Sequence, residues 1–154
     1  MILNYKECME RFGSDYMIKK EIKAGKLFQK GKGLYSDEDF CLELELVVAK
    51  YPRAVFARES AYYYYGLTDV IPDYYFLATK RGDTRIKDKR IKQTFVNDDL
   101  FEFGACEIEY QNIKIPIYSK ERLLVDLVRL KNKIPFDYYK EIIGSYRRII
   151  NELD

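Results

Sequence analysis

The sequence predicts an α+β fold divided into two domains, residues 1–38 and residues 39–154. Apolar residues recur at helical spacing near both ends of the chain, and apolar runs of strand length lie between them. An acidic triplet, residues 37–39, marks a change of composition between the two domains. With 154 residues, 47% of them hydrophobic, the chain is long enough to bury a core.

The first predicted helix begins after Asn4 and ends at Gly13. Its apolar residues recur at i, i+3, i+4 and i+7, on one face that we expect to be buried: Tyr5, Cys8, Met9 and Phe12. Asn4 and Glu7 have the spacing of a capping box, which satisfies free amide groups at the start of a helix. Gly13 can adopt the left-handed conformation that commonly ends a helix.

A second helix is predicted immediately afterwards, from a cap at Ser14 to Gly25. Ile18 and Ile22 point to the core, and the other face carries Tyr16, Lys19, Lys20 and Lys23. Two short strands, residues 26–29 and 34–36, then flank a turn whose glycines permit a tight hairpin. Two helices joined by so short a turn and followed by a hairpin are typical of a minimal winged helix-turn-helix.

The charge distribution supports the same interpretation. The net charge is only +2, yet residues 1–36 hold eight Lys or Arg against four Asp or Glu. Lysine ammonium groups bind phosphates, whereas Ser14 and Tyr16 are the candidates for reading base edges. An exposed charged face without a DNA partner is the alternative. The predicted DNA-binding residues are Ser14, Tyr16, Lys19, Lys20, Lys23, Lys26, Lys30 and Lys32.

The remainder of the chain predicts an α/β domain with a mixed sheet and C-terminal helices. Turn-forming residues separate its apolar segments, and Ser119 can cap the first of the two closing helices. The expected elements are a helix ending at Pro52, a strand at 54–57, a helix at 59–65, strands at 74–79 and 91–96, a hairpin at 106–118, and two helices beginning near 119 and 137.

A second basic segment, residues 80–92, has seven Lys or Arg against two Asp or Glu. It joins two predicted strands, and loops held on a rigid scaffold often carry function. We therefore predict that it binds a partner, which could be a protein, a nucleotide or a nucleic acid; a mobile charged loop is the alternative. The predicted partner-binding residues are Lys80, Arg81, Arg85, Lys87, Lys89, Arg90 and Lys92.

Several function classes are excluded or disfavoured. The chain has no histidine, which excludes an imidazole base and a histidine metal ligand. Its three cysteines have no paired spacing, and no apolar run is long enough to span a bilayer, so we expect a cytoplasmic protein. Glu107 and Glu109 could suggest metal-dependent phosphoryl transfer, but their alternation with Cys106, Ile108 and Tyr110 favours an exposed strand face. We predict no enzyme, metal or cofactor.

Three segments, in this order, resemble the AbiEi-like antitoxins of type IV toxin–antitoxin (abortive infection) systems. They are residues 59–72 (ESAYYYYGLTDVIP), the end of the next strand at 79–82 (TKRG), and residues 118–129 (YSKERLLVDLVR). In that family a winged helix-turn-helix, matched here by residues 14–35, precedes an α/β antitoxin domain.

The resemblance implies a bacterial phage-defence regulator that binds double-stranded operator DNA and represses its own operon. It also implies that the protein counteracts a cognate nucleotidyltransferase-like toxin. The alternative is a non-catalytic protein-interaction module whose reduced winged helix does not bind DNA.

Overall fold

The computed structural model describes residues 1–154 and divides into two compact units, residues 1–52 and residues 53–154. The chain has seven α-helices, a three-stranded antiparallel sheet and a five-stranded mixed sheet, which confirms the predicted α+β class. The division falls after Pro52, later than the predicted boundary at residue 38. The reason is that helix α3 (Glu43–Lys50) packs against the first strand, with Leu44 and Val47 buried.

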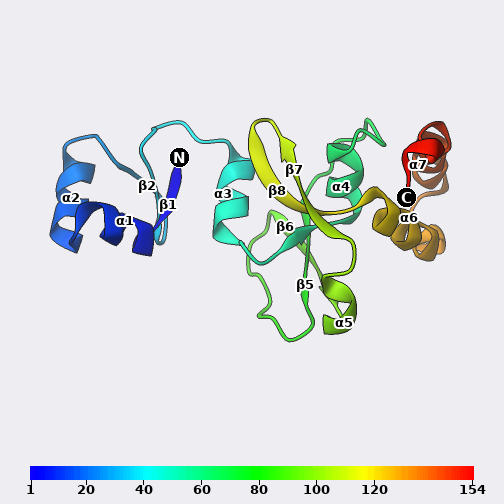
Figure 1. Cartoon of the computed structure of the whole chain (residues 1–154), viewed down its shortest axis with the longest axis horizontal. Helices are drawn as coiled ribbons and strands as arrows, with labels where there is room; N and C mark the ends of the chain where they lie inside the picture. The colour runs from blue at the N-terminus through cyan, green and yellow to red at the C-terminus, as the bar shows by residue number, and fades with distance from the viewer. The chain divides into compact units, whose positions relative to one another are not determined.

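The first unit contains a three-stranded sheet, and two of its helices follow the first strand in the chain (Figure 1). The strand order is β1-β3-β2, and both pairings are antiparallel. Strand β1 was not predicted, because three residues are too few for an alternating pattern to be recognised. In chain order the elements before α3 are β1 (Ile2–Asn4), α1 (Tyr5–Phe12), α2 (Asp15–Lys23), β2 (Phe28–Gly31) and β3 (Leu34–Ser36).

The caps predicted for α1 and α2 are confirmed. The Asn4 side chain accepts a hydrogen bond from the Glu7 amide at 2.9 Å, and the Glu7 carboxylate accepts one from the Asn4 amide at 2.7 Å. Gly13 ends α1 with a φ of 86°, and the Ser14 hydroxyl accepts a hydrogen bond from the Met17 amide at 3.2 Å. The two helices are therefore joined by Gly13 and Ser14 alone.

Side chains from β1, α1, α2, β3 and the residue before β2 meet in one core. The half-buried Met9, Phe12 and Ile22 surround it, and its buried members are Leu3, Cys8, Ile18, Leu27 and Tyr35. Because Ile18 and Ile22 of α2 point into this core, the opposite face of α2 is left to solvent.

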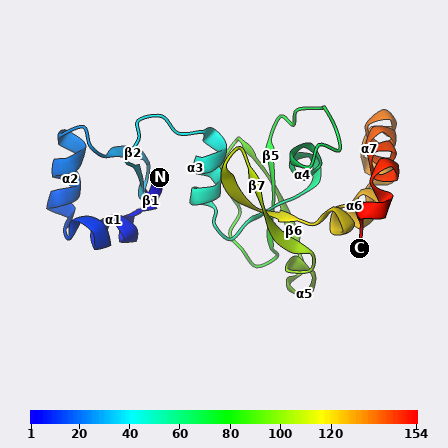
Figure 2. The same cartoon turned by 45° about the horizontal axis from the view of Figure 1, so that its top comes forward.

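The second unit is built on the five-stranded sheet, with order β6-β5-β4-β8-β7. Strands β5 and β6 pair in parallel, as do β4 and β8, whereas β4–β5 and β7–β8 are antiparallel. This is the mixed sheet that was predicted, and Figure 2 shows the closing helices α6 and α7 side by side. The elements are β4 (Val55–Phe56), α4 (Arg58–Tyr64), β5 (Tyr75–Lys80), β6 (Ile91–Val96), α5 (Asp98–Phe101), β7 (Ala105–Tyr110), β8 (Ile113–Tyr118), α6 (Lys120–Arg129) and α7 (Phe136–Arg148), with short 3-10 turns at Lys131–Lys133 and Ile150–Glu152.

Buried tyrosines connect α5 to strand β8 and α7 to α6. The Tyr118 hydroxyl donates to the Phe101 carbonyl at 2.6 Å, and the Tyr146 hydroxyl donates to the Lys120 carbonyl at 2.8 Å. Each ring thus buries apolar area while its hydroxyl is satisfied. No helix combines the length and the apolar character that crossing a bilayer requires.

Because these tyrosines are buried, we expect the protein to lose stability at alkaline pH. Burial raises the pKa of Tyr118 to about 12, and it also raises the pKa of Tyr62 and Tyr146. Below pH 10 the phenols are neutral in both states; above it the unfolded chain ionises while the folded chain does not, so unfolding is favoured. For Tyr118 alone the free energy of unfolding should fall by about 1.4 kcal/mol between about pH 9 and about pH 11.

Urea unfolding followed by circular dichroism at the two pH values measures this change. The variant Tyr118→Phe is the control. It loses a hydrogen bond and is less stable at the lower pH, but the difference between the two pH values should shrink by the contribution of Tyr118. Equal stability of the wild-type protein at both pH values would contradict the expectation.

Candidate nucleic-acid interface

Helix α2 places the predicted basic face in solvent. The Tyr16 side chain is 73% exposed, and Lys19, Lys20 and Lys23 are exposed beside it, whereas Ile18 on the opposite face is 1% exposed. The spacing of these four residues puts them within one side of the helix, since residues three and four apart are neighbours. The cap at Ser14 and the core contacts of Ile18 fix the orientation of this surface, which we call the α2 face.

The three lysines of the α2 face differ in their partners. The Lys19 ammonium lies 3.0 Å from Oδ2 of Asp15, one turn earlier, and this hydrogen bond raises the pKa of Lys19. Lys20 and Lys23 form no ion pair, so their charges are available to an anionic ligand. Asp15 therefore offsets part of the positive charge at one end of the face.

Ser14 is engaged in capping, because its hydroxyl oxygen accepts the Met17 amide. Its hydroxyl hydrogen is the group left for another acceptor. Tyr16 has no such structural role and presents most of its ring to solvent. Of the two residues predicted to read base edges, Tyr16 is thus the more accessible.

The two lysines of the β2–β3 hairpin, Lys30 and Lys32, differ in their partners and in their exposure. A register shift between Gln29 and Gly31 makes Lys30 the extra residue of a β-bulge, and bulges re-aim side chains. The Lys30 ammonium contacts Oδ1 of Asp39 at 3.6 Å, donates to the Asp39 carbonyl and lies over the Phe28 ring, and its side chain is only 17% exposed. Lys32, in the turn before Gly33, is exposed and unpaired, as is Lys26.

The basic residues of the second segment differ in their partners and in their exposure. Lys80 lies 3.9 Å from Oε1 of Glu102, and the Arg90 guanidinium donates two hydrogen bonds to Asp88, at 2.8 and 3.1 Å. Lys92 lies on β6 with its ammonium 4.6 Å from the centre of the Tyr74 ring. The exposed residues of the segment are Arg81, Arg85, Lys87, Lys89 and Lys92.

The loop that carries most of these residues is fastened to the sheet by Gln93. Oε1 of Gln93 accepts the Ile86 amide at 2.7 Å, and Nε2 donates to the Thr79 hydroxyl at 2.8 Å and to the Thr84 carbonyl at 3.2 Å. The exposed cations are therefore presented by a loop with defined anchors. Partner binding by this segment stays a prediction.

The acidic pair of β7 has the exposure that its sequence pattern predicted. Glu107 and Glu109 are exposed, and Ile108 and Tyr110 are half-buried; Cys106, expected on the buried face, is exposed near the open end of the hairpin. No group of three or more His, Cys, Asp or Glu side chains is arranged to hold a metal ion.

The structure also reveals a cavity that no sequence pattern indicated. It lies in the second unit beside Glu59 and Tyr138, two residues that are 79 positions apart in the chain. Glu59 opens the first of the three quoted segments, but nothing in its neighbours suggests a pocket. Comparison with known proteins adds no assignment, since no family model and no curated protein matches the chain.

Proposed function

We propose that this protein is a DNA-binding antitoxin that represses its own operon and counteracts a nucleotidyltransferase-like toxin. The observation that carries the DNA-binding part is the α2 face, where Tyr16, Lys20 and Lys23 are exposed and unpaired on a helix held rigidly from behind. The order of α1, a two-residue joint, α2 and a hairpin fits a minimal winged helix-turn-helix.

In this proposal α2 enters the major groove and its lysines neutralise phosphates on either side. Lysine point charges fix the position of the helix on the duplex, and the Tyr16 hydroxyl contacts a base edge. Lys32 at the hairpin turn and Lys26 at the start of the hairpin add backbone contacts. The toxin-directed part rests on the resemblance of residues 59–72 and 118–129 to the antitoxin family.

A salt titration of DNA binding tests the proposal. If the four unpaired lysines, Lys20, Lys23, Lys26 and Lys32, each meet a phosphate, the logarithm of affinity should fall against the logarithm of salt with a slope of about −3.6, at ~0.9 per contact. The measurement is fluorescence titration of the full chain with labelled duplex from the region upstream of its gene. A scrambled duplex of equal length separates specific from general binding, and no binding at low salt would refute the proposal.

The interaction-module alternative also has an observation in its favour. Asp15 partly neutralises Lys19, and Asp39 holds Lys30 away from the hairpin turn. A protein that used these elements only for packing would bind neither duplex, at any salt concentration. The same titration therefore decides between the two functions.

A further inference from the structure

Buried polar atoms without a partner gather at one place in the second unit. The chain has four of them: Nε of Arg58, Oε2 of Glu59, and the hydroxyls of Tyr62 and Tyr138. Three come from the first turns of α4 and the fourth from the first turn of α7, and the rings of Tyr62 and Tyr138 lie 6.5 Å apart. Because buried polar groups are nearly always hydrogen-bonded, their concentration here points to a ligand.

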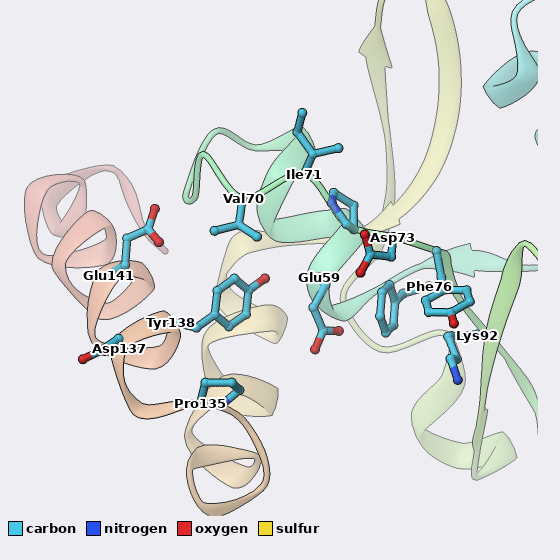
Figure 3. Close-up of a pocket in the computed structure, with 12 residues that line it drawn as sticks. Glu59, Val70, Ile71, Asp73, Phe76, Lys92, Pro135, Asp137, Tyr138 and Glu141 are labelled. Atoms are coloured by element: carbon cyan, nitrogen blue, oxygen red, sulfur yellow. The ribbon is translucent and has the colours of Figure 1, made fainter.

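Two of these four residues, Glu59 and Tyr138, line a cavity of about 600 Å³. This volume is ordinary for sites that take small organic molecules. Figure 3 shows Tyr138 reaching from α7 toward the side of the cavity formed by Glu59 and Asp73. Val70 and Ile71, which are 51% and 71% exposed, give the cavity an apolar rim.

The lining of the cavity is acidic. Its four carboxylates belong to Glu59, Asp73, Asp137 and Glu141, and its one ammonium belongs to Lys92. Glu141 already accepts the Asp69 amide at 3.1 Å, and Figure 3 shows Asp137 turned away from the cavity. Glu59 and Asp73 are therefore the carboxylates that a ligand inside would meet.

Two residues that line the cavity, Glu59 and Phe76, already hold a guanidinium, that of Arg58, which does not itself line the cavity. Arg58 has a φ of 50°, a left-handed conformation that is costly for this residue type. Its guanidinium donates to Oε1 of Glu59 at 3.2 Å and lies 5.5 Å from the centre of the Phe76 ring. Side chains of successive residues in a helix do not normally face each other. The left-handed backbone at Arg58 accompanies its contact with Glu59, and the carboxylate of Glu59 and the ring of Phe76 together form a site for a cation.

We propose that the cavity binds the guanidinium head of an alkylguanidine. The head group donates hydrogen bonds to Oε2 of Glu59 and to the Tyr138 hydroxyl, and its alkyl chain lies along Val70 and Ile71. Burial, with Glu59 as the next cause, raises the pKa of Tyr138, so its hydroxyl stays neutral and can accept such a bond. The same head group occurs in free alkylguanidines and in the arginine side chains of proteins.

Calorimetric titration of the full chain with n-butylguanidine tests the proposal. We expect saturable binding, and we expect n-butylurea, a neutral molecule of nearly the same shape, to bind at least about tenfold more weakly because it lacks the charge. Acetyl-arginine amide, which carries an arginine side chain as a protein does, tests whether the ligand is an arginine side chain. Tighter binding of this compound than of n-butylguanidine assigns the site to an arginine side chain, and the reverse order assigns it to a free alkylguanidine.

Three variants locate the binding. Glu59→Gln should weaken n-butylguanidine binding about tenfold to a hundredfold, the effect of losing one charge-assisted hydrogen bond. Tyr138→Phe keeps the Arg58–Glu59 ion pair and should weaken binding about threefold to tenfold, so it tests the site even if Glu59→Gln disturbs α4. Asp137→Asn, on the neighbouring residue of α7, should bind like the wild-type protein.

Four results would each overturn the proposal. The first is the absence of saturable binding, and the second is equal affinity for n-butylguanidine and n-butylurea. The third is an equal loss of affinity in Asp137→Asn and Glu59→Gln, and the fourth is no loss of affinity in Tyr138→Phe. DNA binding is measured separately, and neither result depends on the other.

Discussion

The double substitution Lys20→Glu/Lys23→Glu should weaken binding to operator duplex about a hundredfold at moderate salt. Each change removes a cation that has no ion-pair partner on the α2 face and places a like charge beside the phosphates. The slope of log affinity against log salt should become shallower by about 1.8, two contacts at ~0.9 each. Fluorescence titration at several salt concentrations measures both quantities.

A control with the same change in net charge is Lys6→Glu/Lys140→Glu. Both residues are exposed, on α1 and α7, and neither belongs to the α2 face. This variant should retain nearly all of the affinity. If the two double variants lose affinity equally, binding depends only on total charge and the α2 face is not the interface.

In cells, the Lys20→Glu/Lys23→Glu variant also tests whether the two proposed activities are separate. It should lose repression of a reporter placed behind its own promoter while it still protects cells from the neighbouring toxin. The substituted lysines are exposed, so the fold of either unit has no reason to change. Loss of protection by a stably folded variant would show that the first unit also takes part in neutralisation.

Gly104→Ala should lower the free energy of unfolding by about 3–5 kcal/mol. Gly104 has a φ of 74°, and a Cβ atom there would lie 2.7 Å from Cβ of Arg122 and 3.2 Å from the Ser119 hydroxyl. Its carbonyl also accepts the Ser119 amide at 2.7 Å, next to the cap of α6. The backbone therefore cannot move away without disturbing the start of that helix.

Arg122 makes a compensating movement costly. Its guanidinium donates to the carbonyls of Leu100 and Phe103 at 2.6 and 2.7 Å and to Asp126 at 3.1 Å, and it lies 4.4 Å from the centre of the Tyr118 ring. Displacing its Cβ would loosen all of these contacts together. Urea unfolding followed by circular dichroism gives the change in stability.

Gly66→Ala is the matched control for Gly104→Ala. Its φ is 71°, yet no atom lies within 4 Å of the position that a Cβ would take. In Gly66→Ala the free energy of unfolding should fall only by the cost of placing alanine in the left-handed conformation, about 1–2 kcal/mol. The difference between the two variants therefore isolates the close approach to Arg122, and equal losses would mean that this approach carries no energetic weight.

Elements marked by a local pattern were predictable from the sequence, whereas a short strand defined only by its distant partner was not. Helices α1 and α2 follow from caps and helical spacing within a few residues, and their bounds agree with the structure. Strand β1 exists because Leu3 pairs with Tyr35, which no local pattern reveals. Similarly, α3 belongs to the first unit because of its contact with β1, so an acidic triplet was a poor guide to the boundary.

In the candidate sites, too, only features with a local sequence pattern could be predicted. The exposure of Lys20 and Lys23 followed from helical periodicity, because the opposite face of α2 is apolar. The turning of Lys30 toward Asp39 depends on a bulge in the hairpin, and the sequence offers no sign of it. The cavity joins residues from α4, β5, β6 and α7, so only the folded chain could reveal it.

The anchoring of the loop by Gln93 bears on how readily proteases cleave the chain. Between Thr84 and Ile91 lie four Lys or Arg residues, each a cleavage point for trypsin-like proteases. Such enzymes need several residues of backbone free to adopt an extended shape in their active site. One amide side chain, by holding both Thr84 and Ile86, thus restrains the backbone on either side of Arg85, and we expect it to slow cleavage there.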